Sequence, residues 1–558
     1  MTDPDLGIRE VDELEPVLPL DDVQGNVLPG FNKRHQQLVG LRIVDLGGTK
    51  RWISALAPEI TTASEVVHFK ELRRALKARR DGGTTGLASA WLSIAFSAPA
   101  LRRLVSPDDV DLFEDDAFKV GLAASASAIG DPPPGTQIPG SPSWWEAGGS
   151  EGTTPDVLLV LAADVPEMLT FHRKRVDDLV AAAGPSVEVF FEQNGDDLPG
   201  PLRSHEHFGF RDGISQPGVR GRLPWSPNEF FTPRFLAGED PDAGLIAKPG
   251  QPLVRVGQFL FGYATQDRLV PEYPAPAREA PPWAVNGSFL VFRRLEQDVA
   301  AFRSFIAAKT AELTSQPELK ELTEGHFAAL LVGRWPSGAP LSRTGTSDDP
   351  ALAQGDITPN AFEFAEASRV YTLREGHEDP FPPAPADLSG LRCPIWAHVR
   401  KVNPRDITTE QGSDTDTLRR RILRRGIPFG DPFDHGDAGS ARGLLFVSYQ
   451  TSITDQFQFL VSSWMNTTDK PQEDEKGDGH DMLVGQNPTR NQERVRTARL
   501  RIPAGGARSY PFSTGEGEQW VFASGGGYFF APSLSALTGV IATGESRTDA
   551  GIGGNGRP

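Results

Sequence analysis

The feature that most constrains the fold is a succession of apolar runs and helical segments that occurs in both halves of the chain. In the first half, an apolar run over 156–162 precedes a helical segment over 165–183 and a second run over 187–191. In the second half, a run over 288–292 precedes a helical segment over 296–314. Short apolar runs suit buried strands, and their alternation with helices predicts an α+β fold. The two similar patterns suggest an ancient duplication, although no clean sequence repeat is visible.

The length of 558 residues exceeds one ordinary domain and allows a large core. The 58 Gly and 48 Pro predict many turns and long irregular connections. These patterns predict five regions: a flexible segment over 1–20, an N-terminal domain over 21–217, a Pro- and Gly-rich connection over 218–282, a C-terminal domain over 283–543, and a disordered tail over 544–558.

The net charge of −18 argues against non-specific binding to nucleic acid or to an anionic membrane. The arginine-rich run over 419–425 is a local exception. No apolar segment is long enough for a membrane-spanning helix. The start of the sequence has neither a charged-then-apolar leader nor a twin-Arg pair, so we expect a cytoplasmic protein. A single cysteine, Cys393, excludes an intramolecular disulfide and a Cys-based zinc site.

The stretch His-Glu-His-Phe-Gly-Phe-Arg-Asp-Gly-Ile-Ser-Gln-Pro over 205–217 places a carboxylate on a glycine-rich turn beside phenylalanines. Gly209 and Gly213 allow the backbone to turn and to approach another group closely. Asp212 is then held where its surroundings can shift the pKa of its carboxyl group and so suit it to act as an acid or a base. From these residues alone, an Asx-type turn after a strand is the simpler interpretation.

Two further stretches carry possible chemistry. In Cys-Pro-Ile-Trp-Ala-His-Val-Arg-Lys-Val-Asn-Pro-Arg, over 393–405, His398 lies in an apolar segment followed by cations. This pattern suits an iron ligand with cations for haem propionates, although a hydrogen-bonded core histidine is the more common case. In Ile-Leu-Arg-Arg-Gly-Ile-Pro-Phe-Gly, over 422–430, the residues alone are typical of a basic helix end stopped by Gly and Pro.

Taken together, these stretches resemble the dye-decolorising peroxidases, haem enzymes that reduce hydrogen peroxide. Gly-Phe-Arg-Asp-Gly is similar to the family's Gly-x-x-Asp-Gly signature, and the stretch around His398 is similar to its proximal segment. The third stretch resembles Ile-x-Arg-x-Gly-x-Pro-Tyr-Gly, with Phe429 in place of the usual tyrosine. The segment that begins at Asp22 is also similar to the opening segment of the longer family members. The resemblance is greatest to the long-chain branch that contains the fungal enzymes.

The resemblance implies roles for individual residues. His398 is the expected proximal iron ligand, Asp212 the group that moves a proton between the peroxide oxygens, and Arg424 the cation that stabilises the developing charge. Arg405 is an expected propionate partner. Asp481 is the expected acceptor of a hydrogen bond from the proximal imidazole.

Other implied positions complete the cofactor pocket and its connection to the surface. Leu444 and Phe446, two apart on one strand, are expected to form the distal wall, and Gln216 is assigned to the same pocket. Trp464 matches a position that serves as a surface radical site in similar fungal enzymes. An ordinary Trp packed at a helix end is an equally good interpretation of this residue.

The resemblance also implies the activity and architecture. It predicts two ferredoxin-like domains, each an antiparallel sheet with peripheral helices, and haem b held mainly by the C-terminal domain. Hydrogen peroxide would be reduced through an oxoferryl intermediate, and bulky dyes and phenolic or other aromatic donors oxidised in one-electron steps. Two alternatives are a haem-binding iron-release or storage protein without peroxidase turnover and a haem-free interaction protein.

We predict that His398→Ala loses or greatly weakens haem binding, because no nearby second imidazole is expected to replace this ligand. The Soret band after haem reconstitution measures the loss. His205→Ala and His207→Ala are the matched controls and should keep a normal ferric spectrum. A normal spectrum in His398→Ala together with its loss in His207→Ala would refute the assignment.

Overall fold

The structure, a computed structural model, describes residues 14–79, 87–150, 152–267, 273–433, 440–472, 478–488, 493–502 and 508–545. Residues 1–13 of the predicted flexible segment and residues 546–558 of the predicted tail lie outside these ranges.

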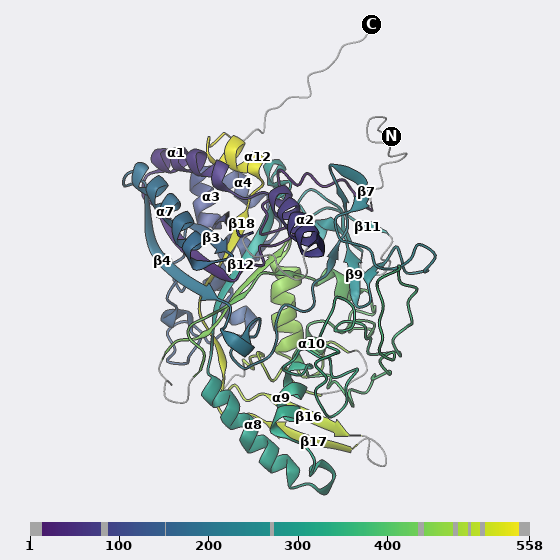
Figure 1. Cartoon of the computed structure of the whole chain (residues 1–558). Helices are drawn as coiled ribbons and strands as arrows, with labels where there is room; N and C mark the ends of the chain where they lie inside the picture. Colours follow the sequence, from purple (N-terminus) through teal and green to yellow (C-terminus); the bar gives the residue numbers. More distant parts are fainter. Residues whose placement is uncertain are drawn as a thin grey trace.

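One antiparallel sheet runs through both halves of the described chain (Figure 1). Its order is β13-β15-β12-β18-β2-β3-β1-β4, and β14 also pairs with β15. The strands are β1 (His35–Ile43), β2 (Ala90–Phe96), β3 (Val157–Ala163), β4 (Val187–Asp196), β12 (Ser288–Gln297), β13 (Leu423–Arg424), β14 (Ile427–Phe429), β15 (Gly443–Gln450) and β18 (Val521–Ala531). The halves meet where Phe530 of β18 pairs with Phe96 of β2. The predicted α+β class is confirmed, whereas the domain boundaries stay a prediction.

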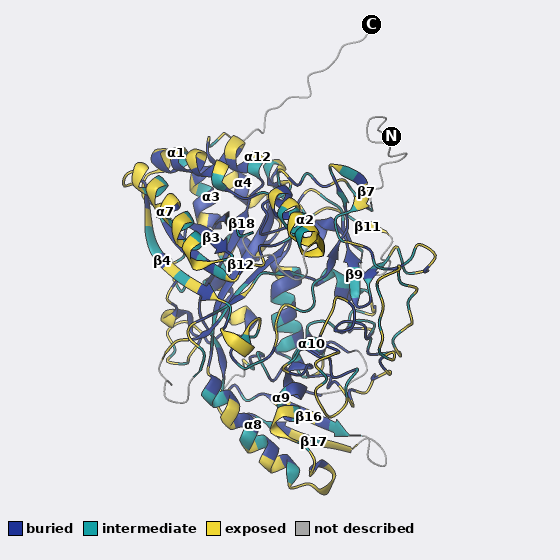
Figure 2. Ribbon diagram, viewed as in Figure 1, coloured by how far each residue is buried: buried dark blue, intermediate teal, exposed yellow. Residues whose placement is uncertain are grey.

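The central strands are apolar on both faces because each face packs against a separate core. In β12, Phe289 and Val291 enter one buried cluster, and Leu290 and Phe292 enter another. Successive side chains of a strand point to opposite faces, so both faces of this strand are covered. Figure 2 shows the result as a dark interior, with exposed positions on the outer sides of the helices. This burial explains why the strands appear in the sequence as continuous apolar runs.

Helices flank the sheet and form a separate lobe at one end. The α-helices are α1 (Leu46–Leu56), α2 (Ala63–Arg79), α3 (Ala98–Leu104), α4 (Pro107–Asp111), α5 (Asp116–Val120), α6 (Leu122–Ser125), α7 (Pro166–Ala182), α8 (Val299–Thr314), α9 (Glu324–Val332), α10 (His398–Lys401), α11 (Asp416–Arg419) and α12 (Leu534–Ala536). Helix α7 packs on β1, β2 and β3. Helices α8 and α9 pack on each other at the opposite end of the molecule (Figure 1).

Tighter and wider turns of helix complete the helical structure. The 3₁₀ turns are η1 (Ala57–Glu59), η2 (Ala126–Ile129), η3 (Pro142–Trp144), η4 (Gly200–Leu202), η5 (Val256–Gln258), η6 (Pro282–Ala284) and η7 (Pro317–Leu319). The π-helical segments are η8 (Ile453–Gln458), η9 (Leu460–Met465) and η10 (Leu537–Ile541). The chain that follows β15 is therefore π-helical, a form that is frequent at functional sites.

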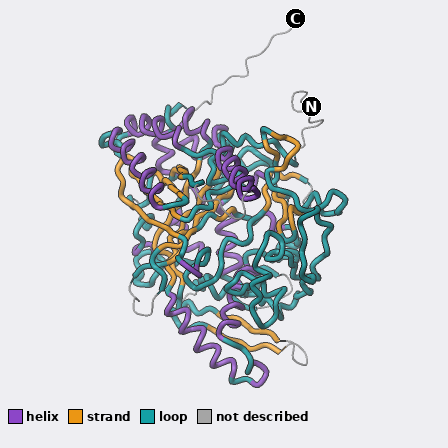
Figure 3. Tube along the Cα trace, viewed as in Figure 1, coloured by secondary structure: helices purple, strands orange, loops and turns teal. Residues whose placement is uncertain are grey.

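The connection predicted over 218–282 contains short strands. They are β5 (Gly218–Val219), β6 (Arg222–Leu223), β7 (Ser226–Phe230), β8 (Ile246–Lys248), β9 (Gln251–Val254), β10 (Thr265–Gln266) and β11 (Pro274–Ala275). Much later in the chain, β16 (Thr497–Ile502) and β17 (Arg508–Ser513) form a hairpin. The hairpin β16–β17 was not anticipated. Much of the remaining chain in this part is loop, visible in teal on the right of Figure 3.

The N-terminal segment is anchored, contrary to the prediction that residues 1–20 are flexible. Leu18 and Leu20 are fully buried. Glu15 is buried as well and accepts hydrogen bonds of 2.8 Å from both Arg220 and Arg234. Acidic and proline-rich composition suggested loose chain, but this carboxylate neutralises two buried guanidinium groups far along the sequence. For residues 14–20, the prediction was wrong.

No helix in the described parts of the chain is long and apolar enough to cross a membrane.

We predict that Glu15→Gln lowers the free energy of unfolding by about 3–5 kcal/mol, because the substitution leaves two buried cations without their anion. Urea unfolding of the purified protein measures the change. Asp21→Asn is the matched control, since Asp21 lies in the same segment but is exposed. Equal stabilities of the two variants would show that the ion cluster does not anchor the segment.

Candidate active site

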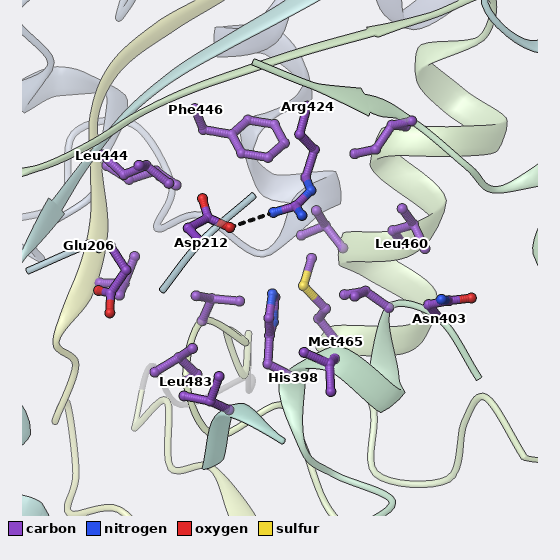
Figure 4. Close-up of a pocket in the computed structure, with 18 of the residues that line it drawn as sticks. Glu206, Asp212, His398, Asn403, Arg424, Leu444, Phe446, Leu460, Met465 and Leu483 are labelled. Carbon is purple, nitrogen blue, oxygen red and sulfur yellow. Dashed lines mark hydrogen bonds and ion pairs between the residues drawn. The ribbon is translucent and has the colours of Figure 1, made fainter. Parts of the chain in front are cut away.

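The two halves of the chain enclose a cavity of about 330 Å³. Asp212 and Arg424 lie on one side of it, and His398 lies opposite them (Figure 4). The structure therefore brings together the three residues on which the sequence interpretation depends. Arg405, Leu444 and Phe446 also line the cavity.

The loop that carries Asp212 is held by the carboxylate of Glu206. This carboxylate accepts hydrogen bonds of 2.9 Å from the amides of Phe208 and Phe210. Gly209 and Gly213 have φ values of 94° and 73°, which favour glycine and allow the loop to turn. Glu206 lines the cavity, and burial raises the pKa of its carboxyl to about 7. The sequence interpretation missed this residue, because its partners are backbone amides and the side chain of Gln297, 91 residues further along the chain, which no motif specifies.

Asp212 and Arg424 form an ion pair at the cavity wall. Arg424 Nη1 donates to Asp212 Oδ1 at 2.9 Å, and Arg424 Nη2 donates to the Ser215 carbonyl at 3.2 Å. Their side chains are 38% and 33% exposed, respectively, and both line the cavity. Burial opposes ionisation of Asp212, but the Arg424 guanidinium and the Gly213 amide hold the pKa of this carboxyl below its usual value. Asp212 is therefore a carboxylate that is available as a base in acidic solution.

Gln216 positions Arg424 and is not among the residues that line the cavity. Its amide nitrogen donates to the Arg424 carbonyl at 3.1 Å, and its amide oxygen accepts from the Arg424 amide at 3.2 Å. The two bonds tie the loop that carries Asp212 to strand β13. Gln216 was expected in the cofactor pocket, but it lies outside the cavity lining and instead supports Arg424.

His398 begins helix α10 and is oriented by Asp481. Its Nδ1 lies 2.7 Å from Asp481 Oδ2, while Oδ1 of the same carboxylate accepts from the amides of Leu483 and Val484. Asp481 is fully buried; burial opposes its ionisation, but His398 and the two amides hold its pKa below the usual value. With Nδ1 engaged in this way, Nε2 is the ring nitrogen left for a ligand in the cavity.

An apolar wall stands beside Asp212 on strand β15. Leu444 and Phe446 point to the same face, as residues two apart on a strand do. In the antiparallel register, Leu444 lies opposite Leu295 of β12, which also lines the cavity. Phe446 packs against Phe457 of η8, with ring centroids 5.8 Å apart. The wall is rigid because it belongs to the central sheet.

Four further arginines line the cavity without a carboxylate within ion-pair distance in the described chain: Arg211, Arg334, Arg405 and Arg421. Arg405 donates to the carbonyls of Asn360 and Phe362, and Arg334 donates to the carbonyls of Gly338 and Pro359. The Arg421 guanidinium has no hydrogen-bond partner among the described residues. Burial first, and neighbouring arginines second, lower the pKa of Arg334 and of Arg421 to about 9. Such a cluster favours an anionic group.

The arginine run over 419–425 divides between several tasks. Arg420, Arg421 and Arg424 line the cavity, and of these Arg420 pairs with Asp416 and Arg424 with Asp212. Arg425 pairs with no carboxylate in the described chain and does not line the cavity. Its guanidinium is enclosed and donates to the carbonyls of Asn26, Val27 and Arg424, and burial lowers its pKa to about 10. The run alone cannot show this division, because the partners come from distant segments.

Trp464 is not at the surface, so its prediction as a surface radical site was wrong in that respect. The side chain is 0% exposed. Leu460 and Trp464, four residues apart, share the buried side of η9. The indole Nε1 donates to both carboxylate oxygens of Glu410, at 3.1 and 3.2 Å. Trp464 does not line the cavity, whereas the next residue in the chain, Met465, does.

The donor set of the cavity suits a metal that brings most of its own ligands. In the described chain, no three His, Cys, Asp or Glu side chains gather as a metal site. One oriented imidazole, apolar walls and arginines without carboxylate partners together fit an iron porphyrin with anionic propionates.

Comparisons with known proteins agree with this geometry. Residues 22–197 match the family model described as "DyP dimeric alpha+beta barrel domain", and residues 383–475 match "Dyp-type peroxidase, C-terminal". The chain is 30% identical to "Dye-decolorizing peroxidase msp1" of Mycetinis scorodonius over 94% of this chain and 88% of that protein. It is 27% identical to "Multifunctional dye peroxidase DyP2" of Amycolatopsis over 93% and 95%, respectively.

Solved structures give the same result. An ancestral D-type dye decolorizing peroxidase superimposes with a TM-score of 0.73 at 32% identity, covering 94% of this chain and 99% of that one. A single-site mutant of the dye-decolorizing peroxidase from Pleurotus ostreatus gives a TM-score of 0.72 at 27% identity, with the same coverages.

We predict that Asp481→Asn lowers the free energy of unfolding of the haem-free protein by about 1–3 kcal/mol, because an amide cannot accept all three hydrogen bonds. The pKa of Asp481 is depressed in the folded protein, so its contribution is fully present above the unfolded value near 3.9 and is lost as the pH falls through the lower folded pKa. Urea unfolding should therefore show a constant difference from wild type at pH 5–8 that shrinks below about pH 4. Exposed Asp469→Asn is the control and should show no difference.

Proposed function

The chain belongs to the dye-decolorizing peroxidase family, whose members are haem enzymes, and from this we propose that its cavity binds haem b, reduces hydrogen peroxide and oxidises dyes and other aromatic donors. The observation that carries the proposal is that the Asp212–Arg424 ion pair lies across the cavity from His398 (Figure 4). The Nδ1 atom of His398 is hydrogen-bonded to Asp481.

His398 holds the iron through Nε2, and Arg421, Arg334 and Arg405 hold the propionates. The support for this is the electrostatic state of the cavity: these three arginines lack a carboxylate partner in the described chain, as does Arg211, and burial lowers the pKa of Arg334 and Arg421 to about 9. Two propionate groups would neutralise these cations and accept hydrogen bonds from their free N–H groups. Haem supplies the redox chemistry when it is bound.

Asp212 moves the proton. Its carboxylate lines the cavity opposite His398, so it can accept a proton from one oxygen of peroxide and deliver it to the other. Arg424 holds Asp212 ionised and presents N–H groups toward the same space, where they stabilise negative charge as the O–O bond breaks. The departing oxygen leaves as water.

Asp481 and the apolar wall serve the same reaction from opposite sides. The buried Asp481 carboxylate fixes the His398 ring and increases its basicity, which strengthens it as an iron ligand. Leu444 and Phe446 keep the space beside Asp212 small and apolar. The space admits peroxide but not a bulky dye, so large donors require a route for electrons through the protein.

We predict that the second-order rate constant for peroxide activation stays near its neutral value down to about pH 4. The depressed pKa of Asp212 keeps the base ionised there, whereas a histidine base with a pKa near 6.5 would already be protonated. Stopped-flow spectra of the haem band give the rate constant at each pH.

In the same experiment, Asp212→Asn and Arg424→Leu should lower this rate constant by roughly 10²–10⁴-fold at every pH. Asp455→Asn is the matched control, because Asp455 is paired with Arg278 at 2.7 Å and also has a lowered pKa, but it does not line the cavity. Rapid activation in both Asp212→Asn and Arg424→Leu would remove these residues from the mechanism.

A further inference from the structure

Trp464 occupies a position from which it can pass electrons to the cavity without being part of its wall. It lies on η9 next to Met465, which lines the cavity and is drawn close to His398 in Figure 4. The indole is fully buried and packs edge-on against Phe459, with ring centroids 5.3 Å apart. A donor that is too large for the cavity therefore cannot touch this ring. Direct contact between a donor and an exposed indole cannot explain how Trp464 would receive an electron.

The feature that distinguishes Trp464 is the acceptor of its N–H group. Both carboxylate oxygens of Glu410 lie within hydrogen-bond distance of Nε1, at 3.1 and 3.2 Å. Glu410 is partly exposed, and its backbone amide donates to the Pro471 carbonyl at 2.9 Å, which fixes the loop. The carboxylate therefore stands between a buried indole and the solvent.

Other oxidisable side chains near the site lack such an acceptor. Trp396, two residues before His398, donates its Nε1 to the Arg499 carbonyl at 2.8 Å, and a carbonyl cannot take up the proton. The Tyr449 hydroxyl accepts from the amide of Asn26, and burial raises the pKa of this phenol to about 12. Phe429 has no ionisable hydrogen at all. Oxidation of any of these would leave a charge or a proton inside the protein.

An indole that loses one electron becomes a cation and a strong acid at Nε1. Because the effective dielectric beside a buried indole is lower than in water, an adjacent carboxylate stabilises this positive charge more strongly there than it would in water. A base within about 2.6–3.2 Å of the proton can also accept it directly. The geometry of Trp464 and Glu410 meets both conditions.

We propose that Glu410 is the proton acceptor that makes the buried Trp464 an electron relay, an inference that rests on the proposed peroxidase function. Trp464 gives one electron to the oxidised centre in the cavity, and its Nε1 proton moves to Glu410, leaving a neutral indolyl radical and a carboxylic acid. A bulky aromatic donor at the surface then supplies one electron, and the proton returns from Glu410 to Nε1. Electrons and protons balance, and the oxidant is the one that peroxide generates.

The partial exposure of Glu410 also defines where the donor docks. Glu410 accepts a hydrogen bond directly from the indole, so a flat dye that contacts Glu410 is separated from Trp464 by this one side chain. Small phenols that reach the cavity do not need this route.

The test is Glu410→Gln, which keeps the shape and one hydrogen-bond acceptor but removes the base. Turnover of a bulky anthraquinone dye should fall at least about tenfold, whereas the stopped-flow rate of peroxide activation should stay within about twofold. Electron paramagnetic resonance after peroxide addition should show a neutral tryptophanyl radical in wild type that is strongly reduced in Glu410→Gln. Unchanged dye turnover and an unchanged radical signal would overturn the proposal.

A double-mutant cycle with Trp464→Phe separates a relay from a structural effect. If Glu410 acts through Trp464, Glu410→Gln should have no further effect on dye turnover in the Trp464→Phe background. A full additional loss there would overturn the proposal. Slow peroxide activation in wild type itself would instead refute the proposed peroxidase function, so the two failures are distinguishable.

The chain offers a matched carboxylate–indole pair as the control. Trp283 Nε1 donates to Asp109 Oδ1 at 3.3 Å, and neither residue lines the cavity. Asp109→Asn should leave both the dye turnover and the tryptophanyl signal unchanged. Loss of dye turnover in Asp109→Asn, with normal turnover in Glu410→Gln, would place the relay at Trp283 and overturn the assignment to Glu410.

Discussion

The pairing of the two-residue strand β13 with β15 is the interaction on which the site depends. It places Arg424 opposite Ser448 and so fixes the guanidinium against Asp212. The same strand β15 carries Leu444 and Phe446 into the cavity and pairs with the central strand β12. Because Gln216 clamps the Arg424 backbone from the other side, the acid–base pair is held by a rigid sheet and not by loops alone.

Electrostatics gives the cavity its second defining property. Arg334, Arg405 and Arg421 line the cavity together, and none of them pairs with a carboxylate in the described chain. Arg334 and Arg405 donate to carbonyl oxygens instead, and the Arg421 guanidinium has no acceptor there. Burying like charges in this way is costly, as the lowered pKa values of Arg334 and Arg421 indicate. An anionic cofactor relieves this cost, so cofactor binding and the stability of the folded protein are linked. The enclosed cations suit an anionic group inside the cavity, not nucleic acid at the surface.

The sequence was informative where a residue's chemistry is fixed by its neighbours in the chain. Asp212 between two glycines, His398 before a run of cations and Arg424 before Gly-Ile-Pro could all be identified in this way. Glu206 and Glu410 could not, since their partners are backbone groups or are distant in sequence, and neither could Arg421, whose guanidinium has no hydrogen-bond partner in the described chain. Burial was predicted least well. Trp464 was expected at the surface and Glu15 in loose chain, because local composition does not show which distant element covers a segment.

The central place of β18 has a consequence for how the protein is made. This strand comes from near the end of the sequence, yet it lies between β12 and β2, where the two halves of the sheet meet. During synthesis, the N-terminal strands and β12 leave the ribosome long before β18 is available to join them. Until then, two unpaired strand edges with apolar faces are exposed, which favours association with other chains. Productive folding therefore depends on protecting these edges until β18 has been synthesised.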